Sequence, residues 1–123
     1  MKLFLSLLIT VSVLLLSSCS FFEASSGQGT TYQYGTMEGY FEAPLDKVHT
    51  VCEKAIKNLE LTKVNSTKDA IFSTYEVKNA KDDTIKISFE RIADRTTKIK
   101  IKVGLLGDKV YSQAIYDNIK KLL

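Results

Sequence analysis

Two neighbouring segments in the last third of the chain alternate apolar and polar residues with a period of two. The apolar positions are Ile85, Ile87 and Phe89 in the first segment, and Ile99, Ile101 and Val103 in the second. Successive side chains of a strand point to opposite faces, so this alternation predicts a hairpin with one apolar face. Only the register that pairs these positions in reverse order keeps the six side chains together. It places Ile92 opposite Thr96 and leaves a three-residue loop at 93–95.

Two other segments repeat apolar residues at helical spacing. The stripes are Leu45, Val48, Cys52, Ala55, Ile56 and Leu59 in the first, and Tyr111, Ala114, Ile115, Ile119 and Leu122 in the second. The first predicts a helix over 44–59, with Pro44 at the opening position, where its missing N–H costs nothing. The second predicts a closing helix with Asp108 as its N-cap.

Three shorter segments, 37–42, 61–66 and 70–78, are rich in strand-forming residues. Both faces of 70–78 carry bulky side chains, so the pattern leaves its buried face open. The order of elements predicts the α+β class, as a two-layer sandwich (β-α-β-β-β-β-α). In it, an antiparallel sheet of about five strands carries two helices packed on one face.

The first nineteen residues have the layout of a secretory signal. Lys2 supplies a positive charge, residues 3–16 form an apolar run, and two serines lead into Cys19. The run is shorter than the ~20 residues of a comfortable transmembrane helix. Its end, Leu16-Ser17-Ser18-Cys19, resembles the bacterial lipobox. That resemblance implies a diacylglyceryl group on Cys19, a membrane anchor and removal of the preceding residues.

The chain is therefore predicted to have three parts. Residues 1–18 form a lipoprotein signal peptide that is removed, residues 19–35 a lipidated N-terminus with a flexible tether, and residues 36–123 the α+β domain. The Ser- and Gly-rich centre of the tether has no apolar period and cannot bury a core. Tyr32 and Tyr34 either belong to the tether or begin the fold by pairing loosely with a sheet edge.

Further motifs strengthen the lipoprotein interpretation. A Gly-containing first strand runs into Ala43-Pro44-Leu45-Asp46-Lys47-Val48, and Val103-Gly104-Leu105-Leu106-Gly107-Asp108 precedes the last helix. Together with the lipobox, these motifs resemble an uncharacterised family of small bacterial envelope lipoproteins over residues 36–123. The family has no assigned activity, so the resemblance implies the fold order and the envelope location alone. Ser20, rather than an Asp, follows the lipid site, which by the lipoprotein sorting rule implies the outer membrane, facing the periplasm.

The net charge of the chain limits which partners the protein is expected to bind. Without Lys2, 16 Lys and Arg residues face 14 Asp and Glu residues, a formal charge of +2. This near balance argues against nucleic acid and leaves anionic lipid, a glycan or an envelope protein as candidate partners.

Lipidation of Cys19 leaves Cys52 without an intramolecular partner, either shielded in the core or available as a reactive thiol. Its place in the helical stripe favours burial.

The residue types that perform chemistry do not converge in the sequence. His49, the only histidine, lies three residues before Cys52, but no further ligand or charge partner joins them. Asp82 and Asp83 are adjacent residues in a polar turn, typical of turn formers. Gly104 and Gly107 fit no phosphate-binding motif. We therefore predict a protein that is not an enzyme and that holds no cofactor and no metal.

A row of lysines is the remaining candidate site. Lys98, Lys100 and Lys102 share one sheet face with Lys86 of the facing strand. The predicted register sets Glu90 opposite Lys98 but Lys86 opposite Lys102, a pair of like charges. Such a row either is a solvated face that discourages edge pairing or contacts an anionic surface.

The favoured interpretation is a non-catalytic, membrane-anchored interaction or structural module of the bacterial envelope. Two alternatives stay open. A small apolar ligand or lipid could be carried between the helices and the sheet, or Cys52 could support a thiol-dependent function.

Overall fold

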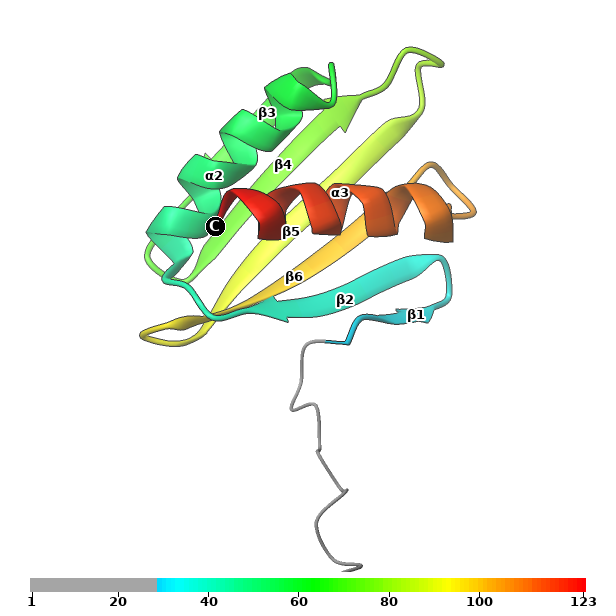
Figure 1. Ribbon diagram of the computed structural model, residues 1–123. Coiled ribbons are helices and arrows are strands. Elements are labelled where there is room, and N and C mark those ends of the chain that lie inside the picture. The colour runs from blue at the N-terminus through cyan, green and yellow to red at the C-terminus, as the bar shows by residue number, and fades with distance from the viewer. Residues whose placement is uncertain (1–28) are drawn as a thin grey trace, which may run out of the picture.

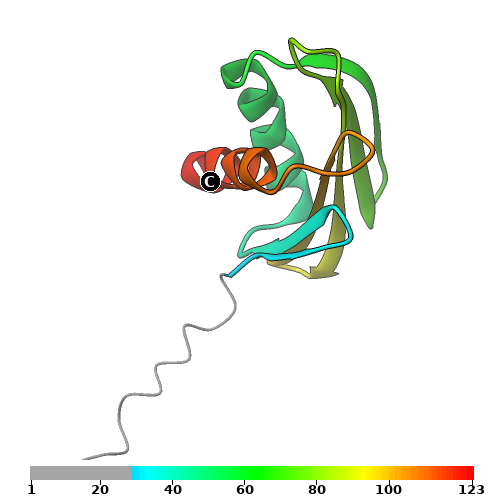
Figure 2. The same ribbon diagram turned by 90° about the vertical axis from the view of Figure 1, so that its right-hand side faces the viewer.

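The computed structural model describes residues 29–123. Over this range six strands form one antiparallel sheet, and two helices cover one of its faces (Figures 1 and 2). The elements are β1 (Thr31–Gln33), β2 (Thr36–Phe41), α2 (Leu45–Asn58), β3 (Thr62–Lys68), β4 (Phe72–Lys78), β5 (Thr84–Ala93), β6 (Thr96–Val103) and α3 (Lys109–Leu122). Their order across the sheet is β1-β2-β6-β5-β4-β3. The predicted α+β class and antiparallel sheet are confirmed.

The prediction of about five strands is one short in the described part of the chain. The additional strand, β1, pairs with the edge strand β2, setting Tyr32 opposite Met37. Tyr32 packs against the buried core, so this tyrosine begins the fold at the edge of the sheet and does not belong to the tether. Three residues are too few for a period-two pattern to register in the sequence. The predicted signal peptide and the lipid site at Cys19 lie outside the described residues.

The helix layer differs in detail from the predicted pair on one face. Both helices lie on the same side of the sheet, but they cross one another rather than running side by side (Figure 1). Helix α2 packs on β3, β4, β5 and β6, whereas α3 packs on β2 and β6 and against α2. Neither helix in residues 29–123 has the length and apolar character that crossing a bilayer requires.

The central hairpin has the predicted register. Ile85 pairs with Val103, Ile87 with Ile101 and Phe89 with Ile99, and all six side chains are buried. The predicted end of the hairpin is wrong. A bulge follows Arg91, so that Ala93 rather than Ile92 lies opposite Thr96 and β5 continues to Ala93. The extra residue of the bulge leaves the Ile92 side chain half exposed.

The structure also decides which faces of β4 and α3 are buried. Ser73, Tyr75 and Val77 of β4 point toward the helices. The buried residues of α3 are Ser112, Ile115, Tyr116 and Ile119, so the predicted stripe is wrong at two positions: Ala114 and Leu122 are exposed. Ser112 and Tyr116, which carry hydroxyl groups, are buried instead. A search for apolar residues at helical spacing does not identify such positions.

Tyr116 explains the glycine in β2. Its ring stacks on Phe41 with centroids 4.8 Å apart, and its hydroxyl donates to the carbonyl oxygen of Tyr40 at 2.9 Å. The ring also lies directly over Gly39, where an added Cβ would meet Cε2 of Tyr116 at 2.6 Å. Only a residue without a side chain leaves room for this ring between α3 and the sheet.

We expect Gly39→Ala to destabilise the fold by about 1–3 kcal/mol, because Tyr116 must leave both its stacking partner and its hydrogen bond. The free energy of unfolding in urea measures the effect. Gly29→Ala is the matched control, since an added Cβ there meets nothing within 4 Å. Equal stability of the two variants would contradict the tight packing of Tyr116 on β2.

Candidate functional site

The predicted row of lysines lies on the outer face of the sheet, opposite the helices, but its members differ in whether a carboxylate lies beside them. The ammonium group of Lys98 is 2.8 Å from the carboxylate of Glu38, and that of Lys100 is 3.9 Å from the same oxygen. Glu38 lies on β2, which is the other neighbour of β6 in the sheet. The hydrogen bond between Lys98 and Glu38 lowers the pKa of this carboxyl and raises that of Lys98.

The other two lysines are directly opposite one another. Lys86 of β5 pairs across the sheet with Lys102 of β6, and neither forms an ion pair within residues 29–123. Like charges at directly opposed positions are unfavourable for a sheet. The positive charge of this face is therefore concentrated at the end of the hairpin that leads to α3.

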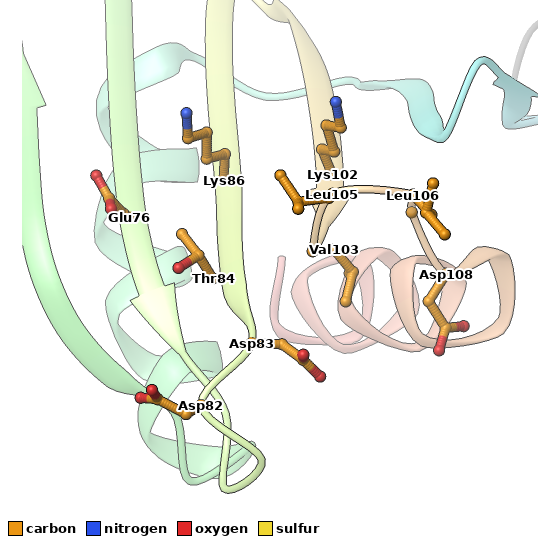
Figure 3. Close-up of a pocket in the computed structure, with 12 residues that line it drawn as sticks. Glu76, Asp82, Asp83, Thr84, Lys86, Lys102, Val103, Leu105, Leu106 and Asp108 are labelled. Atoms are coloured by element: carbon orange, nitrogen blue, oxygen red, sulfur yellow. The ribbon is translucent and has the colours of Figure 1, made fainter.

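An open hollow of about 810 Å³ lies at this end of the sheet (Figure 3). It is lined by Glu76, Asp82, Asp83, Thr84, Lys86, Lys102 and residues 103–108. In Figure 3, Lys86 and Lys102 point to the same side, whereas Asp82, Asp83 and Asp108 point away from them. Glu76 of β4 lies directly opposite Lys86 in the sheet, so an anion that approaches from the lysine side meets two ammonium groups and one carboxylate.

Three of the four acidic lining residues, all but Glu76, have partners of their own. Asp82 forms an ion pair with Lys78 at 3.3 Å, and the side-chain amide of Asn79 donates to Asp83 at 3.2 Å. The side chain of Asp108 accepts from the backbone N–H of Tyr111 at 2.9 Å, as expected for the N-cap of α3. These bonds agree with roles of the aspartates in a turn and in a helix cap. They do not hold two carboxylates in the arrangement that a catalytic pair requires.

The loop between β6 and α3 contributes two apolar side chains to the hollow. Leu105 is 93% and Leu106 is 91% exposed. The sequence identified this segment as a motif of the family resemblance and its glycines as unlike a phosphate-binding motif, but it did not assign the leucines to a site. Their position between Gly104 and Gly107, where the alternation stops, is the feature that could have identified them as loop residues.

A second cluster of polar side chains joins α2 to β4. The hydroxyl of Ser73 is hydrogen-bonded to Nδ1 of His49, and Nε2 of His49 lies 2.9 Å from the hydroxyl oxygen of Tyr75. The Tyr75 hydroxyl also lies 3.0 Å from the carbonyl oxygen of His49 and 3.3 Å from Oε1 of Glu53. Lys63 completes the chain with an ion pair to Glu53 at 3.0 Å.

One tautomer of His49 satisfies this network. With the proton on Nε2, Nδ1 accepts from Ser73, and Nε2–H donates to the oxygen of Tyr75, whose own hydroxyl then donates to the Glu53 carboxylate or the His49 carbonyl. The order serine, histidine and acid resembles that of hydrolases, but Ser73 is fully buried. A nucleophile that no substrate can reach performs no chemistry, so the cluster attaches α2 to the sheet.

Cys52 lies inside the core, as its place in the helical stripe predicts. Its side chain is fully buried, and burial raises the pKa of the thiol to about 12. Nucleophilic cysteines react as thiolates, which such a pKa keeps scarce at neutral pH. His49 and Cys52 share a helix but not a site, because the ring of His49 contacts Ser73 and Tyr75 instead. Within the described residues no group of three or more potential metal ligands is present.

Comparison with known proteins places the chain in a family. The family described as a protein of unknown function, DUF3568, matches residues 2–122. Because the match covers nearly the whole chain, the protein belongs to this family. No curated protein matches the chain.

The His49 cluster predicts how stability depends on pH. Burial lowers the pKa of His49 below its ordinary value of 6.5, with Lys68 and Lys63 lowering it further and Glu53 and Asp46 opposing them. The unfolded chain therefore takes up the proton first, and stability falls as the pH drops from about 6.5 toward the folded pKa. The pKa values of Glu53 and Asp46 are lowered from ordinary values of 4.5 and 3.8, so these carboxyls act at lower pH.

We expect His49→Gln to flatten the dependence of stability on pH just below 6.5, because glutamine keeps hydrogen-bonding groups but does not titrate. Urea unfolding of both proteins at several pH values measures the slope. A variant with the same slope as the wild type would assign the dependence to other groups.

Proposed function

We propose that this member of the DUF3568 family is a lipid-anchored, non-catalytic protein of the bacterial envelope whose domain binds an anionic partner. The observation that carries the proposal is Leu16-Ser17-Ser18-Cys19 at the end of an apolar run. The residues matched by the family include this segment. The proposal combines an anchor, drawn from the sequence, with a binding face, drawn from the described domain.

The anchor would be the acylated Cys19. A single acyl chain gives marginal membrane binding, whereas two or more chains hold a protein stably. The diacylglyceryl group that a lipobox implies already supplies two chains. Ser20 in the following position supports the outer membrane, facing the periplasm, as the proposed location. Residues 19–30 span at most about 40 Å even when fully extended, so the domain would stay close to the lipid surface.

The geometry of the described domain supports binding rather than catalysis. The one serine that is hydrogen-bonded to the histidine, Ser73, is sealed beneath α2. Asp83 and Asp108 at the hollow are held by a turn and by a helix cap. Lys86 and Lys102, in contrast, form no ion pair among residues 29–123 and line an open hollow, with Glu76 as the cross-strand neighbour of Lys86. An anionic envelope protein, lipid or glycan would relieve the repulsion between them.

The two alternative functions have less support. The space between the helices and the sheet is filled by buried side chains that include Met37, Phe89 and Tyr116. The 810 Å³ hollow lies instead at the end of the sheet, where it is open to solvent. An enclosed apolar carrier site is therefore not favoured. A thiol-dependent function is not favoured either, because Cys52 is buried with a raised pKa.

The anchor predicts which cysteine carries lipid. We expect labelled palmitate to be incorporated by the wild-type chain and by Cys52→Ser, but not by Cys19→Ser. The label is read from the purified protein after electrophoresis. Cys52→Ser is the matched control, since the chain has two cysteines and only Cys19 follows the lipobox pattern. Label in the Cys19→Ser chain, or none in the wild type, would end the lipoprotein proposal.

The binding face predicts a contact in intact cells. A photo-crosslinking amino acid at Thr84, inside the hollow, should form an adduct with the partner, whether protein, lipid or glycan. Lys86→Gln with Lys102→Gln should lower the adduct yield severalfold, because a lysine near an anionic surface contributes up to about 1 kcal/mol.

Lys98→Gln is the control for this experiment, since the ammonium group of Lys98 is already neutralised by Glu38. It should leave the adduct yield unchanged. The same yield from the double variant would remove the lysine pair from the binding face.

A further inference from the structure

We propose that four exposed side chains at one end of the domain insert into the headgroup region of an anionic lipid bilayer. They are Tyr34, Leu105, Leu106 and Val110, here called the apolar tip. The inference rests on the proposed function, because the anchor would supply the bilayer. It adds the partner of the domain, which is the lipid surface itself.

The apolar tip is defined by exposure and position together. Its members are 98%, 93%, 91% and 82% exposed in chain order. They come from the turn between β1 and β2, the loop between β6 and α3, and the first turn of α3. Figures 1 and 2 show this turn and this loop side by side at the same end of the sheet. Apolar side chains gathered in this way mark an interaction surface more often than single exposed ones do.

The two segments that carry the tip are in direct backbone contact. An added Cβ at Gly35 would lie 2.7 Å from the carbonyl oxygen of Leu106, and one at Gly107 would meet the carbonyl oxygen of Gly35. Both glycines also have positive φ, 78° and 82°. The turn and the loop can approach so closely only because neither residue has a side chain. The backbone of the turn at Gly35 is thereby held beside the backbone of Leu106 and Gly107.

Tyr34 occupies a position where its side chain does not help the fold. It has a φ of 53° in a two-residue turn between antiparallel strands, where Asn, Asp or Gly is preferred. Its ring is almost fully exposed, so it gains no burial in return. A tyrosine ring suits the boundary between water and lipid, with its apolar body in the membrane and its hydroxyl in the headgroups.

Three lysines beside the tip supply the positive charge that an anionic surface attracts. Lys102 and Lys86 lie at the base of the Leu105–Leu106 loop, and Figure 3 shows both pointing away from Asp82, Asp83 and Asp108, whereas Glu76 lies beside Lys86. Lys109, also exposed, directly precedes Val110. Apolar side chains flanked by lysines are the usual composition of an interfacial membrane contact.

The shape of the tip favours a lipid surface over a protein partner. Leu105 and Leu106 line one side of the open hollow, but all four side chains of the tip project into solvent. A stable protein interface covers roughly 800 Å² on each partner, more than four projecting side chains provide. A bilayer accepts a small protruding group without a complementary pocket. The chain outside the described residues also favours lipid, because β1 begins 12 residues after Cys19 and ends at the turn that holds Tyr34.

The experiment uses a single tryptophan as reporter, since the chain has none. The full-length protein, purified from cells, is reconstituted in phosphatidylcholine vesicles with and without phosphatidylglycerol. In the anionic vesicles, Leu106→Trp should shift its emission to the blue and lose about half of its fluorescence to brominated lipid, because interfacial groups lie ~5–10 Å deep. Ile92→Trp, at the opposite end of the β5–β6 hairpin, should do neither and is the matched control.

Two further variants in the Leu106→Trp background separate insertion from folding. Tyr34→Asn gives the turn its preferred residue, so quenching should fall while the unfolding temperature stays equal or rises. Lys102→Gln with Lys109→Gln should weaken binding on the order of tenfold. An unquenched Leu106→Trp reporter would overturn the proposal, as would equal quenching at both reporters. Palmitate labelling at Cys19 reports on the anchor independently of all these results.

Discussion

The register of the β5–β6 hairpin is the constraint on which the rest of the structure depends. Pairing Ile87 with Ile101 places the apolar residues of both strands beneath α2 and α3. Because side chains alternate, the same pairing turns Lys86 and Lys102 outward and sets them opposite one another. If one strand shifted by one residue, its apolar side chains would turn outward and its lysines would turn toward the helices. The core therefore determines the charge of the outer face, and the like-charge pair is the electrostatic cost of burying the aliphatic set.

A second constraint acts at the end of the sheet, where the chain leaves β6 for α3. The loop has to cross from the outer edge of the hairpin to the helix layer, and it does so against the turn that joins β1 to β2. Gly35 and Gly107 permit that contact. The leucines between Gly104 and Gly107 consequently project from the fold and cannot be drawn into the core. Their exposure follows from the path of the backbone, although their apolar character does not.

Short-range patterns predicted most of the fold, and long-range pairing accounts for what they missed. The period of two predicted the hairpin register, and the stripe of α2 predicted the burial of Cys52. The bulge after Arg91 was missed because the strand pattern fades there. The ion pair between Glu38 and Lys98 forms because β2 lies beside β6 in the sheet. No local sequence pattern predicts that strand order. The Ser73–His49 contact likewise joins residues whose neighbourhood exists only after α2 has docked on β4.

The short strand β1 links the proposed anchor to the proposed binding surface. The chain enters the described fold at β1, pairs with the edge strand β2 over three residues and turns at Tyr34. An attachment at Cys19 would therefore be followed, within a few residues of the fold, by the apolar tip. Two attachments to one bilayer act together, because the first raises the effective concentration of the second. Even a weak contact of the tip would then suffice to orient the domain on the bilayer.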